Sequence, residues 1–99
     1  MNKYRTHNCG ALNKDFIKKS VLLSGWVHKK RDHGNLLFID LRDNFGITQC
    51  IADKDNKNFT DLEKIPLETV IKIEGTVLQR SSETINNEIP TGEIEIQIK

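Results

Sequence analysis

The sequence has no long apolar run. Its 99 residues are 36% hydrophobic and 29% charged, and its uncharged apolar stretches are only a few residues long. A helix that spans a membrane needs about 20 apolar residues. The first 20 residues mix charged and polar side chains and contain no apolar signal core. These observations argue against a membrane partner, and a cytoplasmic location is expected by default.

Cysteine is scarce, and neither sign of charge is in large excess. Cys9 and Cys50 could form one disulfide, but a cytoplasmic chain would keep both thiols reduced. The formal net charge is +1, from 15 basic and 14 acidic residues. That balance argues against a protein that coats nucleic acid by bulk electrostatics. A local basic run at residues 29–31, with His28 and His33 beside it, suits selective contact better.

Motifs for catalysis and metal binding are absent as well. The sequence contains no glycine-rich phosphate loop and no nucleophile elbow. His7 and Cys9 stand close together, as do His28 and His33, but no second pair stands at a distance that would complete a zinc site. We expect this chain to hold no metal and no cofactor, and to catalyse nothing by itself.

The sequence does contain short alternating segments. Alternation of apolar and polar residues predicts strands, and it occurs at residues 21–30, 36–42, 47–52, 69–79 and 93–99. Residues 59–65 have apolar side chains at helical spacing, and Pro66 ends that segment. Gly25 and Gly75 are expected to bend their strands, as curved barrels require.

The resulting order of elements is β-β-β-α-β-β. This is the order of the five-stranded Greek-key oligonucleotide-binding barrel, the OB fold. An Sm- or SH3-like barrel is the main competitor, but it would not place a helix between the third and fourth strands. We therefore predict an all-β OB-fold domain over residues 1–99, with a short helix between strands three and four and one modest core.

The second predicted strand carries an aromatic ring on its polar face. Leu37, Ile39 and Leu41 share one face, and Phe38 lies on the other face with Leu36, Asp40 and Arg42. OB barrels stack bases of single-stranded nucleic acid on such rings, so Phe38 is the candidate stacking residue. An ordinary core phenylalanine is the alternative, because a slip of one residue exchanges the two faces of a strand. Trp26 has neighbours that favour packing in the core.

Four polar residues complete the candidate surface. Arg31 either contacts phosphate or a base edge or is a solvated loop residue. Gln49 shares a strand face with isoleucines and is either a base reader or a polar residue at the barrel rim. Glu93 and Glu95 could accept hydrogen bonds from base amino groups. Charge that keeps an edge strand soluble is the commoner reason for such a pair.

Short motifs succeed one another through the whole chain. They are R-T-x-x-C-G-x-L at 5–12, G-W-V at 25–27, R-D-H-G at 31–34, F-I-D-L-R-D at 38–43, G-I-T-Q at 46–49, G-T-V at 75–77 and T-G-E-I-E at 91–95. In this order they resemble the N-terminal anticodon-binding domain of bacterial aspartyl-tRNA synthetases. G-W-V is shared with asparaginyl and lysyl enzymes, but the opening motif together with R-D-x-G and F-I-D-L-R-D is specific.

The resemblance implies a class II enzyme that activates aspartate with ATP and magnesium and joins it to tRNA(Asp). Those steps belong to a C-terminal catalytic domain beyond these residues, and such enzymes are homodimers. In the family, the barrel holds the splayed anticodon bases. The resemblance thus implies that Phe38 stacks on one base and that Gln49 hydrogen-bonds the central uracil.

The resemblance also assigns the charged residues. It implies that Arg31 and Arg80 contact the anticodon stem-loop, and that Glu95, rather than Glu93, helps to recognise the first anticodon position. Residues 81–86 lack the lysine and first asparagine of the family's K-N-I-N stretch, although Asn86 matches, which argues against a loop contact there.

His33 bears on which tRNAs the chain recognises. It stands where some members have leucine and resembles the forms that also charge asparagine tRNA, so tRNA(Asn) is a second expected partner. Two other identities fit the sequence: a free-standing single-strand binder on the same barrel, and the equivalent domain of an asparaginyl or lysyl enzyme. A free-standing binder would end near Lys99, whereas a synthetase would continue into a catalytic domain. An asparaginyl or lysyl enzyme would charge a different amino acid.

Overall fold

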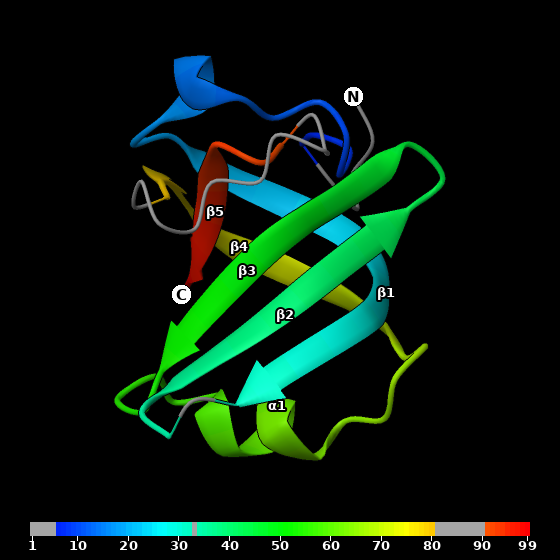
Figure 1. The fold of residues 1–99 in the computed structure, drawn as a ribbon, viewed down its shortest axis with the longest axis vertical. Helices are drawn as coiled ribbons and strands as arrows, with labels where there is room; N and C mark the ends of the chain where they lie inside the picture. The colour runs from blue at the N-terminus through cyan, green and yellow to red at the C-terminus, as the bar shows by residue number, and fades with distance from the viewer. Residues whose placement is uncertain (1–5, 33, 81–90) are drawn as a thin grey trace.

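The described part of the chain folds into a closed five-stranded barrel with one short α-helix (Figure 1). The computed structural model describes residues 6–32, 34–80 and 91–99. The elements are η1 (Lys14–Phe16), β1 (Ser20–Asp32), β2 (Leu36–Asp43), β3 (Gly46–Asp53), α1 (Phe59–Lys64), β4 (Val70–Gln79) and β5 (Ile94–Ile98). The predicted five strands, and the helix between the third and fourth, are confirmed. The 3₁₀ turn η1 was not predicted.

The strand order around the barrel is β1-β2-β3-β5-β4. All neighbours are antiparallel except β3 and β5, which run parallel. The long strand β1 pairs with β4 through its first half and with β2 through its second, and a bulge lies between Val27 and Lys29. Gly25 and Gly75 allow strands to approach closely, since a Cβ there would lie 2.3 Å and 2.5 Å from a carbonyl oxygen of the adjacent strand. This order confirms the OB fold.

Strand alternation places the aliphatic side chains inside the barrel. On β2 the buried aliphatic positions are Leu37, Ile39 and Leu41, and Phe38 between them faces outward and is half-buried. On β5 the three isoleucines are buried, as predicted. Burial of these aliphatic groups supplies most of the driving force for folding.

The neighbours of Trp26 predicted packing in the core, but this prediction is wrong. On β1 the buried positions are the odd-numbered residues 21–27, so Trp26 lies on the outer face, where it is half-buried. It pairs with Arg42 of β2 and with Val70 of β4. The period of two in a strand, and not the character of the neighbouring residues, thus decides which face Trp26 occupies.

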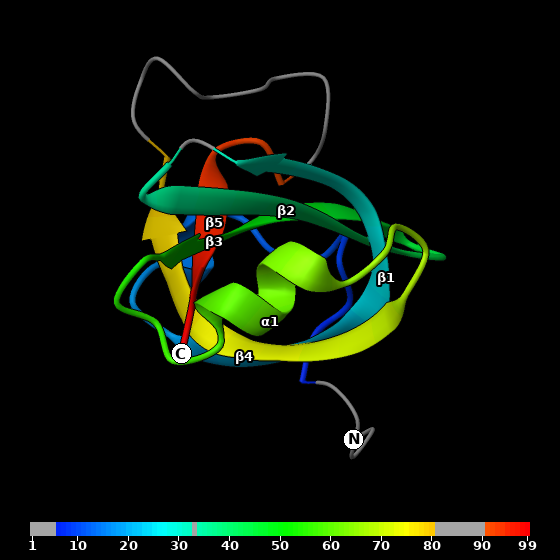
Figure 2. The same cartoon turned by 90° about the horizontal axis from the view of Figure 1, so that it is seen from below.

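Helix α1 lies across one opening of the barrel (Figure 2) and inserts Phe59 into the core. The Nζ atom of Lys30 donates hydrogen bonds to the carbonyl oxygens of Glu63 at 2.8 Å and Ile65 at 2.6 Å. These are carbonyls at the C-terminal end of α1, which lack partners within a helix and favour a cation. Lys30 therefore supports the fold, and the basic run 29–31 is not a continuous basic edge. No helix in the described part of the chain is long and apolar enough to span a membrane.

The segment before β1 lies at the end of the barrel opposite α1 (Figure 1). Cys9 and Leu12 are part of the buried core, and we call residues 9–12 the N-terminal plug. The Cys9 backbone N–H donates to Oδ2 of Asp43 at 2.8 Å, and the Thr48 hydroxyl donates to the Cys9 carbonyl at 2.6 Å. We call Cys9, Asp43 and Thr48 the plug cluster. Cys9 and Cys50 are both buried free thiols, and burial raises the pKa of Cys50 well above its usual value.

Candidate functional site

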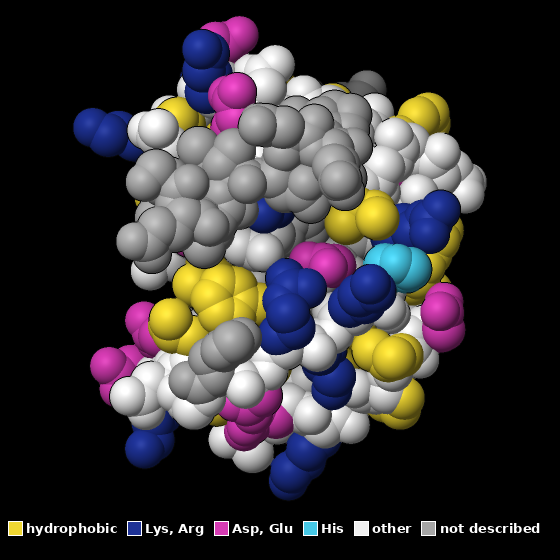
Figure 3. All heavy atoms as spheres, in the orientation of Figure 1, with side chains coloured by type: hydrophobic (Ala, Val, Ile, Leu, Met, Phe, Trp, Pro, Cys, Tyr) yellow, Lys and Arg dark blue, Asp and Glu magenta, His cyan; other side chains and the backbone are white. Residues whose placement is uncertain are grey.

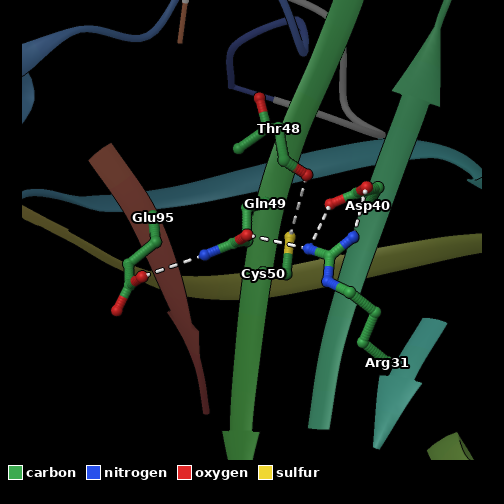
Figure 4. Close-up of polar contacts among 6 residues, drawn as sticks. All are labelled: Arg31, Asp40, Thr48, Gln49, Cys50 and Glu95. Carbon is green, nitrogen blue, oxygen red and sulfur yellow. Dashed lines mark hydrogen bonds and ion pairs between the residues drawn. The ribbon is translucent and has the colours of Figure 1, made fainter. Parts of the chain in front are cut away.

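Four polar side chains from four strands form a continuous row on the outer face of the barrel (Figure 4). Arg31 comes from β1, Asp40 from β2, Gln49 from β3 and Glu95 from β5, and we call them the polar row. Asp40 and Gln49 are directly paired across β2 and β3, and the strands are neighbours in the barrel order. The row exists because these positions all fall on the outward phase of their strands.

Arg31 donates hydrogen bonds to two members of the polar row, and Gln49 donates to the last member, Glu95. The Arg31 guanidinium binds Asp40 with two bonds, Nη1 to Oδ2 at 3.0 Å and Nη2 to Oδ1 at 3.1 Å. Nη2 also donates to Oε1 of Gln49 at 2.9 Å, and Nε2 of Gln49 donates to Oε1 of Glu95 at 3.1 Å. Each amide end of Gln49 therefore meets a partner of complementary charge.

Phe38 lies beside this row. It pairs with Arg31 across β1 and β2, and the Arg31 Cζ atom lies 5.9 Å from the ring centroid, within cation–π distance. On its other side it pairs with Ile51 of β3, which is also half-buried. Figure 3 shows hydrophobic atoms directly beside Lys and Arg side chains on this face of the molecule. A flat, partly exposed ring next to donors and acceptors is suited to stacking a base while its edge is read.

Arg80 lies at the end of β4 and is 7% exposed. Its Nε donates to the carbonyl of Ile94 at 2.8 Å, and its backbone N–H donates to the carbonyl of Glu93 at 2.9 Å. Desolvation by burial lowers its pKa, which the nearby carboxylates of Glu95 and Asp40 oppose, but an arginine stays protonated at neutral pH. Arg80 thus contributes a buried positive charge close to the polar row, and its contact with RNA stays a prediction.

The structure separates the two candidate glutamates. Glu95 is part of the polar row, whereas Glu93 is exposed and lines a hollow near η1 with Lys14 and Asp15. Of the two, only Glu95 contacts Gln49, and its role in reading a base stays a prediction. His33 and Asn86 lie outside the described residues.

Asp40 was not predicted as a site residue. The signal was present in the sequence, because alternation places it on the same face as Phe38. Its pairing with a residue nine positions away on another strand, by two hydrogen bonds, could not be read from one strand alone.

No three His, Cys, Asp or Glu side chains among the described residues come together as metal ligands.

The barrel order, the helix between β3 and β4, and an outward ring beside donors and acceptors define an OB-fold domain of the kind that binds single-stranded nucleic acid. Comparison with known families agrees. The chain belongs to the tRNA anticodon family of OB-fold nucleic acid binding domains, which matches residues 21–99.

Curated relatives match nearly the whole chain. It is 66% identical over 98 residues to the aspartate–tRNA(Asp/Asn) ligase of Pelagibacter ubique, an alignment that covers 99% of this chain and 16% of the relative. It is 54% identical over 99 residues to the enzyme of the same name from Bartonella quintana, covering 100% of this chain and 17% of that one. The resemblance to aspartyl enzymes is thus confirmed, and the chain spans about one sixth of the length of these relatives.

Solved structures match the barrel. Asparaginyl-tRNA synthetase from Pyrococcus horikoshii, complexed with asparaginyl-adenylate, superposes with a TM-score of 0.76 at 25% identity, over 93% of this chain and 20% of that one. An OBody bound to hen egg-white lysozyme superposes with a TM-score of 0.80 at 18% identity, over 99% of this chain and 91% of that one. The second match shows the fold alone.

Proposed function

We propose that the outer face formed by β1, β2, β3 and β5 binds the unpaired anticodon bases of aspartate tRNA. The observation that carries this proposal is the partly exposed ring of Phe38 beside the polar row. Membership of the tRNA anticodon family and the names of the relatives support the choice of ligand.

Each residue of the face has a defined task in this proposal. Phe38 stacks on one base, and the amide of Gln49 reads the edge of the central uracil with its remaining donor and acceptor capacity. Arg31 supplies positive charge at the edge of the site, and Arg80 supplies a second charge below it. Glu95 accepts from a donor on the first anticodon base, as a carboxylate can and a cation cannot.

For the whole protein we propose an aspartate–tRNA ligase that charges both tRNA(Asp) and tRNA(Asn) in the cytoplasm, as a homodimer. Support comes from the relatives, whose names specify both tRNAs, and from the histidine at position 33. ATP, magnesium and the joining of aspartate to tRNA belong, in this proposal, to parts of the protein outside these residues. A charging assay on both tRNAs tests it, and failure to charge asparagine tRNA would reject the dual specificity.

The site itself is tested by the Phe38→Ala variant. Loss of one stacked base should weaken binding of an aspartate anticodon hairpin by about 1–3 kcal/mol. Phe45→Ala is the matched control, because this ring is 61% exposed on the turn between β2 and β3, away from the polar row. Fluorescence titration with labelled hairpins measures both. Unchanged affinity in a folded Phe38→Ala variant would refute the proposed face, and equal binding of unrelated single-stranded RNA would indicate a general binder.

A further inference from the structure

Asp40 binds Arg31, and Arg31 in turn binds the side-chain amide of Gln49. Its two bonds to Arg31 fix the guanidinium in a plane, and the same Nη2 atom that contacts Asp40 also donates to Gln49. The Asp40 side chain is 17% exposed and that of Arg31 is 41% exposed, so the aspartate is the better fixed partner of the pair. Arg31 alone is a long chain that would otherwise sample many rotamers in water.

The amide of Gln49 has a single polarity as a result. Its Oε1 faces the guanidinium and its Nε2 faces the Glu95 carboxylate. A flipped amide would place oxygen against carboxylate and N–H against guanidinium, two repulsive contacts at once. Gln49 is only 5% exposed, so water cannot compensate for those contacts.

A fixed amide polarity selects bases by the order of groups on their edge. One lone pair of Oε1 and one N–H of Nε2 remain available. A uracil presents an imino N–H beside a carbonyl. The N–H can donate to Oε1 of Gln49, and the carbonyl oxygen can accept from Nε2. On cytosine the same ring position is an acceptor and its neighbour is an amino donor. In the same pose, the ring acceptor would face Oε1 and the amino donor would face Nε2, so neither hydrogen bond would form.

We propose that Asp40 is a positioning residue for anticodon specificity: by holding Arg31 it fixes the polarity of Gln49 and lets the site distinguish uridine from cytidine. This inference rests on the proposed function. It adds a separate role for Asp40, which also keeps Arg31 from serving as a phosphate contact. Removal of the Asp40 charge should therefore lower the selectivity for uridine and make binding more dependent on salt.

The test uses Asp40→Asn, which keeps the shape of the side chain and removes its charge. Binding is measured to two anticodon hairpins that differ only in uridine or cytidine at the central position. The ratio of the two dissociation constants should fall about tenfold, the size of one bidentate base contact. The salt dependence should steepen by about 0.7 in the logarithmic slope, because the released Arg31 takes a phosphate. Asp61→Asn, on the exposed face of α1, is the control for loss of one negative charge.

A double-variant cycle shows whether Asp40 acts through Arg31. The Arg31→Gln variant should lose the same selectivity, and adding Asp40→Asn to it should cause no further loss. An unchanged ratio in Asp40→Asn would overturn the proposal. So would equal weakening for both hairpins with an unaltered salt slope, or additive losses in the double variant. If Asp40→Asn does not fold, the Arg31→Gln ratio decides alone, and full selectivity there rejects the idea.

Phe38→Ala on the same hairpins separates the positioning role of Asp40 from the proposed function of the face. Weaker binding by Phe38→Ala with full selectivity in Asp40→Asn would reject only the positioning role. Unchanged binding by Phe38→Ala would reject the proposed function of the face.

Discussion

The molecule contains two clusters of polar side chains that use hydrogen bonds in different ways. In the plug cluster, Asp43 and Thr48 bind backbone groups of Cys9, which lies 34 and 39 positions away in the chain. In the polar row, side chains bind other side chains, and the Arg31 side chain is 41% exposed. Backbone partners in a buried site cannot be exchanged without unfolding, whereas a partly exposed side chain such as Arg31 can exchange its partners for a ligand. The comparison indicates that the first cluster maintains the fold, and it supports the proposal that the second recognises RNA.

The largest expected effect is steric and falls on the plug. A Cβ on Gly10 would lie 2.2 Å from the carbonyl oxygen of Phe45, a backbone atom that cannot move aside cheaply. Gly10→Ala should lower the free energy of unfolding by roughly 3 kcal/mol, at the upper end for overpacking. Urea denaturation measures it. Gly34→Ala is the control, because no atom lies within 4 Å there and only its φ of +77° opposes alanine, at about 1 kcal/mol. Equal losses in both variants would show that the contact is not tight.

The next largest expected effect comes from replacing an aspartate by asparagine in each cluster. Asp43 accepts from the backbone N–H groups of Cys9, Phe45 and Gly46, so Asp43→Asn should cost about 2 kcal/mol of stability. Asp40→Asn breaks a partly exposed ion pair and should cost under about 1 kcal/mol. Selectivity for the hairpins should change only in Asp40→Asn. If Asp43→Asn altered selectivity as strongly in the folded protein, the division between the clusters would be wrong.

The smallest expected effect sharpens the comparison between two neighbours in the sequence. Lys30 binds carbonyls at the end of α1, whereas Arg31 lies in the polar row. Lys30→Met should lower stability by about 1 kcal/mol, because it removes a charged donor from the C-terminal end of the helix. Hairpin affinity should stay within the effect of one lost surface charge. Calorimetry and titration of the same sample test both expectations. A large loss of affinity at constant stability would show that Lys30 contributes to RNA binding.

Much of the fold was predictable because strands have a period of two. The inward isoleucines of β5 and the outward position of Phe38 both follow from alternation with a correct register. Trp26 was misplaced because its neighbours were taken to indicate packing in the core, whereas the phase of β1 turns its side chain outward. The plug was missed because its structure depends on contacts between residues 9 and 43–48, and no local pattern of residues 6–12 reports them.

By itself, the sequence determined the five strands, the two faces of β2 and β5, and the family to which the chain belongs. It also placed Phe38, Asp40 and Gln49 on outward positions, because side-chain direction along a strand is a local property. Only the tertiary structure decided which of these side chains meet. The Arg31–Asp40–Gln49–Glu95 row depends on the strand order and on the bulge in β1, and these bring together residues up to 64 positions apart. Lys30 and Arg31 have different partners for the same reason. They occupy alternate positions on β1, so Lys30 faces the end of α1 and Arg31 faces the polar row.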